Sequence, residues 1–129
     1  MEVMDLDRLV DSVILIDHLN GAIAATGFLE KLDPRRTAIS VITRAEILSG
    51  LAERDWVSVM PLLDQFRLLN IDGAVADLDA RLRREFRWKL PDAFQAALAT
   101  FHRVKFSTRN TKDFDPKKHS FVEIPYTLR

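Results

Sequence analysis

The sequence predicts a layered α/β fold with a mainly parallel central sheet. Short runs rich in β-branched residues alternate with longer segments whose apolar residues recur at helical spacing. The chain has 129 residues and no repeat, low-complexity tract or linker, so we expect residues 1–129 to form one domain. Strands that alternate with helices along a chain are typical of parallel βαβ units.

The first half of the chain supplies two of the expected strands. The first helix stops at Gly21, a residue type that commonly ends helices. The run TAISVI is expected to be a strand because β-branched residues dominate it. In chain order we expect a strand at 8–10, helices at 12–21 and 21–32, a turn at 33–36, a strand at 37–42 and a helix at 43–54.

The second half supplies three more strands. Pro61 is tolerated in its helix only within a first turn or at a kink, whereas Pro91 favours the start of a helix. Asp77 and Asp79 belong to a charged helical face that we expect to contact solvent. In chain order we expect a helix at 56–66, a strand at 67–71, helices at 73–86 and 91–103, and strands at 104–108 and 120–124.

Composition excludes several classes of protein. Nineteen basic residues balance nineteen acidic ones, so net charge provides no general attraction to nucleic acid or to a membrane surface. Apolar stretches are broken by charges well short of the roughly 20 residues of a membrane-spanning helix. The chain has no cysteine, and we see no signal peptide, so we expect a cytoplasmic protein without disulfides and without a membrane partner.

Acidic and amide side chains follow the expected strands. Asp11 comes directly after the first strand, Glu46 follows the second, and Asp92 stands at a helix start. Asn110 and Asp113 follow the strand at 104–108. Because the carboxyl ends of parallel strands meet at one edge of a sheet, we expect these five side chains to converge there.

A cluster of carboxylates implies a divalent cation. Two carboxylates about 4 Å apart repel by roughly 4 kcal/mol at an effective dielectric constant near 20, so several cannot stay ionised in one pocket without compensation. Magnesium or manganese provides it, since hard cations bind oxygen ligands and retain water. A metal-polarised water can attack a phosphodiester, which makes metal-dependent phosphodiester hydrolysis the favoured chemistry.

Each acid also has a purely structural interpretation. Asp11 can cap the helix that begins at Ser12. Glu46 can close a capping box with Thr43 in the sequence TRAE. Asp92 can interact with the dipole of its helix, and Asn110 and Asp113 suit turns.

Four segments resemble the PIN domain family, and most of all the VapC-type toxins of bacterial toxin–antitoxin pairs. They are LVDSVILIDHLNG, AISVITRAEILSG, LPDAFQAALA and FSTRNTKDF, in the order and approximate spacing of that family. The resemblance implies a three-layer α/β/α sandwich with a five-stranded parallel sheet. It also implies a ribonuclease that depends on Mg²⁺ or Mn²⁺, usually a homodimer, inhibited by an antitoxin protein.

By position, Asp11, Glu46 and Asp92 match the family's three acids. Asn110 occupies the asparagine of the T-x-N motif, and Asp113 matches an acid that only some relatives carry. The chain departs from the pattern at its start, where MEVMDLD is an extension or Met4 is the true first residue. The segment RREFRWKLPD before Asp92 is the second departure.

The resemblance assigns roles that we adopt as hypotheses. Asp11 and Asp92 bind the metal directly, Glu46 and Asp113 hold or activate water, and Asn110 assists through its amide oxygen. Basic side chains flank these residues and are expected to contact RNA phosphates, unless they only pair with acids on their own helices; they are Arg87, Lys89, Arg109 and Lys112. The alternatives are a PIN-fold module that binds RNA or protein without cutting, and a nuclease directed at DNA.

Overall fold

Five parallel strands form a single sheet in the order β3-β2-β1-β4-β5. The structure, a computed structural model, describes residues 5–128, so the choice between Met1 and Met4 as the start lies outside the described residues. The predicted five-stranded parallel sheet is therefore confirmed. The strands are β1 (Arg8–Val10), β2 (Thr37–Ser40), β3 (Arg67–Leu69), β4 (Lys105–Ser107) and β5 (Val122–Glu123).

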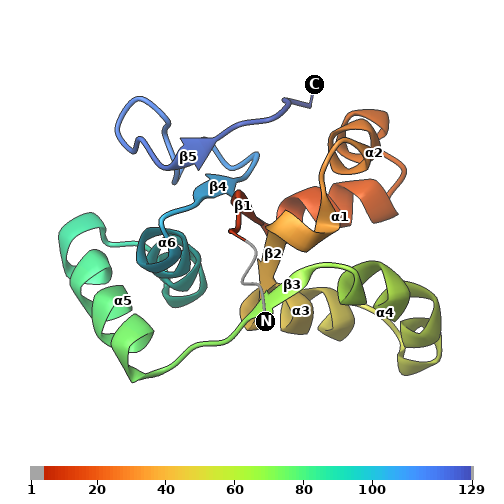
Figure 1. Ribbon diagram of the computed structural model, residues 1–129, viewed down its shortest axis with the longest axis horizontal. Coiled ribbons are helices and arrows are strands. Elements are labelled where there is room, and N and C mark those ends of the chain that lie inside the picture. The colour runs from red at the N-terminus through yellow and green to blue at the C-terminus, as the bar shows by residue number, and fades with distance from the viewer. Residues whose placement is uncertain (1–4, 129) are drawn as a thin grey trace.

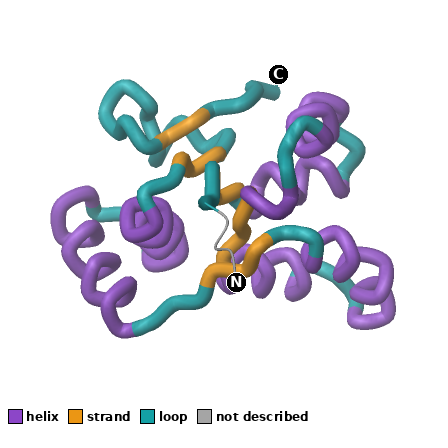
Figure 2. Tube along the Cα trace, viewed as in Figure 1, coloured by secondary structure: helices purple, strands orange, loops and turns teal. Residues whose placement is uncertain are grey.

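Helices cover both faces of the sheet, as Figures 1 and 2 show, with α5 and α6 on one side and α1 to α4 on the other. Among the described residues, no single helix is long and apolar enough to cross a membrane. The pair α1 and α2 together has sufficient length and apolar composition, but the two helices meet at a bend of 117°. The helices are α1 (Ser12–Leu19), α2 (Ile23–Glu30), α3 (Val41–Ser49), α4 (Trp56–Asp64), α5 (Gly73–Phe86) and α6 (Leu90–His102), with short 3₁₀ turns at Pro34–Arg36 and Glu53–Asp55.

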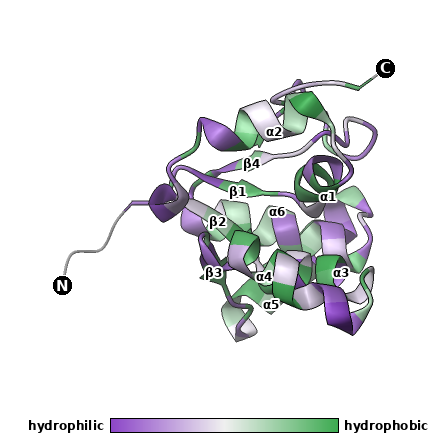
Figure 3. Ribbon diagram, turned by 90° about the vertical axis from the view of Figure 1, so that its right-hand side faces the viewer, coloured by the Kyte–Doolittle hydropathy of each residue, from purple (hydrophilic) through white to green (hydrophobic). Residues whose placement is uncertain are grey.

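Strand alternation builds a separate core on each face of the sheet. Leu9 and Ala38 pack with α5, α6 and Phe106, whereas their neighbours Val10 and Ile39 pack with α1, α3 and α4. Figure 3 shows the hydrophobic residues of β1 and α1 in green. Helices cover both faces, and the polar side chains of the next section lie beyond the carboxyl end of the sheet.

The second strand is shorter than its sequence predicts. Residues 37–42 were expected to be extended, but β2 ends at Ser40 and α3 begins at Val41. The Ser40 hydroxyl accepts a hydrogen bond from the Thr43 amide at 3.1 Å, so Ser40 caps α3 and the capping box proposed at Thr43 is wrong. Pro61 lies inside α4 rather than in its first turn, which removes one backbone hydrogen bond from that helix.

Asp79 is buried, which corrects the expectation that it contacts solvent. Asp79 is only 3% exposed, and within residues 5–128 its Oδ2 atom has no hydrogen-bond partner. Burial raises the pKa of Asp79 above its ordinary value of 3.8, although the charge of Arg83 opposes the rise. Asp77, two positions earlier, is exposed as predicted.

The Asp79→Asn variant is expected to gain stability relative to the unchanged protein as the pH rises. A carboxyl whose pKa is raised by folding favours the native state below its unfolded pKa, and this contribution is lost as the pH rises through the folded pKa. The difference in unfolding free energy between the two proteins should therefore shift by about 1 kcal/mol toward the variant on going from acid to neutral pH. Chemical denaturation at several pH values measures it, with Asp77→Asn as the exposed control; parallel pH profiles for Asp79→Asn and the unchanged chain would contradict the assignment.

Candidate active site

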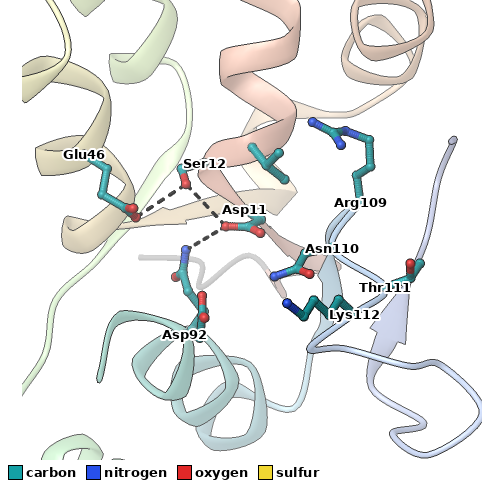
Figure 4. Close-up of a pocket in the computed structure, with 10 residues that line it drawn as sticks. Asp11, Ser12, Glu46, Asp92, Arg109, Asn110, Thr111 and Lys112 are labelled. Atoms are coloured by element: carbon teal, nitrogen blue, oxygen red, sulfur yellow. Dashed lines mark hydrogen bonds between the residues drawn. The ribbon is translucent and has the colours of Figure 1, made fainter. Parts of the chain in front are cut away.

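The candidate site lies at the carboxyl end of β1. The chain runs from β1 outward through β2 to β3 and then crosses to β4 on the other side of β1, an arrangement that opens a crevice beyond the strand ends. The Asp11 amide donates to the Ser107 carbonyl at 2.9 Å, which fixes the end of β1 beside β4. A cavity of about 470 Å³ opens there (Figure 4), and it is lined by Asp11, Ser12, Val13, Glu46, Asp92, Gln95, Arg109, Asn110, Thr111 and Lys112.

The Asp11 carboxylate, at the start of α1, is held in place by other side chains. Its Oδ2 atom accepts a hydrogen bond from the Thr108 hydroxyl at 2.7 Å, and its Oδ1 atom accepts from the Gln95 amide at 3.5 Å. Asp11 occupies the N-cap position of α1 but makes no side-chain cap hydrogen bond, so capping does not account for its carboxylate. Burial raises the pKa of Asp11 above 3.8, and the hydrogen bond from Thr108 opposes that rise.

Glu46 reaches the same cavity from α3. Its Oε1 atom lies 3.4 Å from the Ser12 hydroxyl, which lies equally far from Asp11 Oδ1. Since that hydroxyl carries one hydrogen, it donates to only one of the two carboxylates at a time. Burial raises the pKa of Glu46 above 4.5, and repulsion from Asp11 and Asp92 raises it further.

Asp92 completes the group from the first turn of α6. Figure 4 shows Asp11, Glu46 and Asp92 coming together from three different elements. Burial raises the pKa of Asp92 above 3.8, and the charges of Asp11 and Asp113 add to the rise while Lys89 opposes it. The three carboxylates therefore repel one another within one cavity, which is the arrangement predicted from the sequence.

Asn110 and Asp113 form a unit beside the three acids. The Asn110 amide donates to Asp113 Oδ2 at 2.9 Å, and the Asp113 backbone amide donates to Asn110 Oδ1 at 3.3 Å. The Asn110 backbone amide also donates to the Thr108 hydroxyl that holds Asp11. Asn110 lines the cavity, whereas Asp113 stands behind it and acts on Asp92 through its charge.

A comparison of the sequence with known protein families shows to which family this chain belongs. The PIN domain family matches residues 8–118, which include all five predicted site residues. The chain belongs to the PIN domain family. The match covers every strand of the sheet except β5.

Known PIN-domain proteins resemble this chain over most of its length. Ribonuclease VapC10 of Mycobacterium tuberculosis is 34% identical over 114 residues, which cover 82% of this chain and 84% of that protein. A toxin–antitoxin complex from Klebsiella pneumoniae contains a chain that is 36% identical, with a TM-score of 0.87 over 95% of this chain and 100% of that one. FitAcB from Neisseria gonorrhoeae shares the fold, with 24% identity and a TM-score of 0.79 over 94% of this chain and 99% of that one.

The four basic residues expected to contact RNA occupy different surroundings in this PIN domain. Lys112 lines the acidic cavity, and Arg87 lines a neighbouring one. Lys89 is exposed at the start of α6. Arg109 lines the acidic cavity, but Figure 4 shows its guanidinium turned away from the acids.

Arg109 pairs with the buried Asp17. Its Nε and Nη2 atoms donate to the two carboxylate oxygens of Asp17 at 2.6 and 2.9 Å, and the Tyr126 hydroxyl donates to the same carboxylate at 2.8 Å. Burial alone would raise the pKa of Asp17, but these hydrogen bonds bring it below 3.8. This pairing leaves Arg109 less free to bind a phosphate than Lys112.

The Arg109→Gln variant is expected to lose about 2 kcal/mol of unfolding free energy, because it leaves the Asp17 carboxylate buried without its charged partner. The matched control is Lys112→Gln, because Lys112 is exposed and makes no ion pair within the described residues. Urea denaturation compares the two variants. Equal stability of Arg109→Gln and Lys112→Gln would show that the Asp17 pair is not structural.

Gln95 belongs to the site but is absent from the sequence prediction. It is 2% exposed, and its Nε2 atom donates to the Thr43 hydroxyl at 2.8 Å as well as to Asp11. Its Oε1 atom is buried and has no partner within residues 5–128. The sequence does contain one indication of this role. Gln95 follows Asp92 by three positions in the same expected helix, so the two side chains lie on the same helix face.

The donor set suits a hard divalent cation bound partly through water. Among residues 5–128, no three acidic or histidine side chains are grouped closely enough to hold an ion by themselves. Magnesium generally uses one or two carboxylates and keeps several waters. Three mutually repelling carboxylates and the unpartnered Gln95 oxygen supply acceptors for both the ion and its waters.

Proposed function

We propose that this PIN domain is a metal-dependent endoribonuclease and acts as the toxin of a toxin–antitoxin pair. The observation that carries the proposal is the convergence of Asp11, Glu46 and Asp92 on one cavity, where, beyond the effect of burial, Asp11 and Asp92 raise the pKa of Glu46 and Asp11 raises the pKa of Asp92. The similarity to a ribonuclease and to a toxin–antitoxin complex supports RNA as the substrate and an antitoxin as the partner.

Asp11 and Asp92 would hold Mg²⁺, for which Mn²⁺ substitutes, and the bound ion supplies positive charge for a phosphate oxygen and for a water. Glu46 is exposed and lines the same cavity, where its carboxylate would orient a water and accept a proton from it. A water oxygen would attack phosphorus as the bond to the leaving ribose oxygen breaks in line, and that oxygen would take a proton from solvent water.

The remaining residues position these groups. Thr108 and Gln95 fix the orientation of the Asp11 carboxylate through hydrogen bonds. Asp113 holds Asn110 against the cavity and adds negative charge near Asp92, which strengthens the attraction for a cation. Lys112 contributes a cation for the phosphate next to the scissile bond.

Side-by-side digestion tests the choice of substrate. The purified protein with Mg²⁺ is incubated with a labelled single-stranded RNA and with DNA of the same sequence. We expect internal cleavage of the RNA and none of the DNA. Preferential cleavage of DNA would replace the proposal with a DNA-directed nuclease, and no cleavage together with no uptake of manganese in calorimetry would leave a binding module.

A cytoplasmic ribonuclease harms its own cell unless it is neutralised. We therefore propose that a small antitoxin protein binds the acidic cavity, and that the toxin forms a homodimer. Co-expression with the product of the adjacent open reading frame is expected to suppress RNA cleavage and to yield a stable complex. Unchanged cleavage in the presence of that product would argue against the pairing, and sedimentation measures the oligomeric state.

A further inference from the structure

A second cavity of about 270 Å³ adjoins the acidic one. Lys112 lines both cavities. Asp113 lines the second, and its side chain is bonded to Asn110, which lines the first. Figure 4 shows the Lys112 side chain extending toward Asp92 and Asn110. We call this second space the aromatic cavity, after the residues Phe86 and Trp88 that form part of its wall.

Phe86 and Trp88 give the aromatic cavity a fixed stacking surface. Their rings are stacked, with centroids 4.7 Å apart and planes 28° apart. Trp88 is buried, packs against Phe114 and donates from Nε1 to the Asp113 carbonyl at 2.9 Å. Phe86 is 38% exposed, so a rigid indole supports a phenyl ring that still faces solvent.

Unpaired cations surround this surface. Arg87, Lys112 and Lys118 line the aromatic cavity, are exposed, and make no ion pair within the part of the chain that the structure describes. Arg87 has a left-handed backbone with φ of 61°, an unusual conformation for a residue other than glycine, which ends α5.

The two acids of the aromatic cavity each accept a hydrogen bond from an uncharged amide and keep their negative charge. Asp113 accepts a hydrogen bond from Asn110, and Asp115 accepts one from the Lys117 backbone amide. His119 packs edge-on against Phe86. Three cations therefore stand against two carboxylates around the partly exposed Phe86 ring, and cations beside an aromatic ring are the combination that binds a stacked base and its phosphates.

We propose that the aromatic cavity binds one unpaired nucleotide of the RNA next to the scissile bond. This inference rests on the proposed ribonuclease function and extends it to the class of substrate. The base stacks on Phe86, and Arg87, Lys112 and Lys118 contact the adjoining phosphates. A base held in a duplex cannot be splayed onto Phe86, so the cavity selects single-stranded RNA or a loop.

The test measures RNA binding separately from cleavage. In the Asp92→Asn background, which keeps the RNA intact, fluorescence anisotropy gives the affinity for a labelled single strand. Phe86→Leu keeps apolar volume but removes the aromatic face, and we expect binding about tenfold weaker. Phe101→Leu is the matched control, because Phe101 is 50% exposed at the far end of α6, and it should bind as tightly as the background.

Two further measurements do not depend on how well Phe86→Leu folds. With the Phe86 side chain intact, an RNA that lacks one base at the stacking position should bind about tenfold more weakly than the complete RNA. The double variant Arg87→Gln/Lys118→Gln should reduce the slope of log affinity against log salt by about 1.4, whereas Lys31→Gln/Arg54→Gln should leave it unchanged.

The outcomes separate this inference from the proposed function. If the unchanged chain cleaves RNA but neither Phe86→Leu nor loss of the base weakens binding, the aromatic cavity is not a nucleotide site and the ribonuclease proposal stands. Equal affinity for duplex and single-stranded RNA also overturns the inference. If the unchanged chain neither binds nor cleaves RNA, both fail.

Discussion

We expect the Asp92→Asn variant to cleave RNA at a rate about a thousandfold lower than the unchanged chain, and to fold equally well. Asparagine keeps the shape of the side chain and removes a charge that the site needs to bind a cation. Within residues 5–128 the Asp92 carboxylate makes no side-chain hydrogen bond, so the substitution breaks no contact that supports the fold.

Initial rates on labelled RNA with Mg²⁺ measure the loss, and thermal melting checks the fold. The control is Asp77→Asn, an exposed aspartate on α5 whose replacement should leave the rate unchanged. Full activity of purified Asp92→Asn would remove Asp92 from the reaction and leave its raised pKa as a feature of burial alone.

Withdrawing the divalent cation should have an effect of similar size. Without an ion, Asp11, Glu46 and Asp92 repel one another in a partly buried cavity, and a chelator is expected to reduce cleavage about a thousandfold. Mg²⁺ or Mn²⁺ should restore it. Metal at about 100 times its dissociation constant should also stabilise the native state by about 3 kcal/mol.

Melting with and without Mn²⁺ measures this stabilisation without reference to activity. Asp11→Asn and Asp92→Asn should show little of the shift, and Asp77→Asn should show all of it. Two results together would contradict cation binding by the three carboxylates: RNA cleavage that persists in the presence of a chelator, and a melting temperature that Mn²⁺ does not change.

The sequence was sufficient for the layers of the fold and for the convergence of the acids, because both follow from simple rules. Parallel strands place the residues after them at one edge, so Asp11, Glu46 and Asn110 were predictable from strand order alone. Helix caps are decided by local geometry, and here the sequence misled. TRAE resembles a capping box, yet Ser40 caps the helix and leaves Glu46 free for the site.

Partners that are distant in sequence could not be predicted. Asp17 and Arg109 are 92 residues apart, and nothing local shows that they pair. Gln95 resembles any polar residue of an alanine-rich helix until Asp11 and Thr43 are placed around it. Asp79 was misassigned because charge favours solvent, and its burial depends on tertiary packing that the sequence does not show.

A crystal structure with Mn²⁺ soaked into the unmutated protein tests the central claim most directly. We predict an anomalous peak in the acidic cavity, with oxygens of Asp11 and Asp92 at about 2.1 Å and waters that reach Glu46 and Gln95. A cavity without manganese at saturating concentration, with the three carboxylates turned apart and each bonded to backbone amides, would contradict the account.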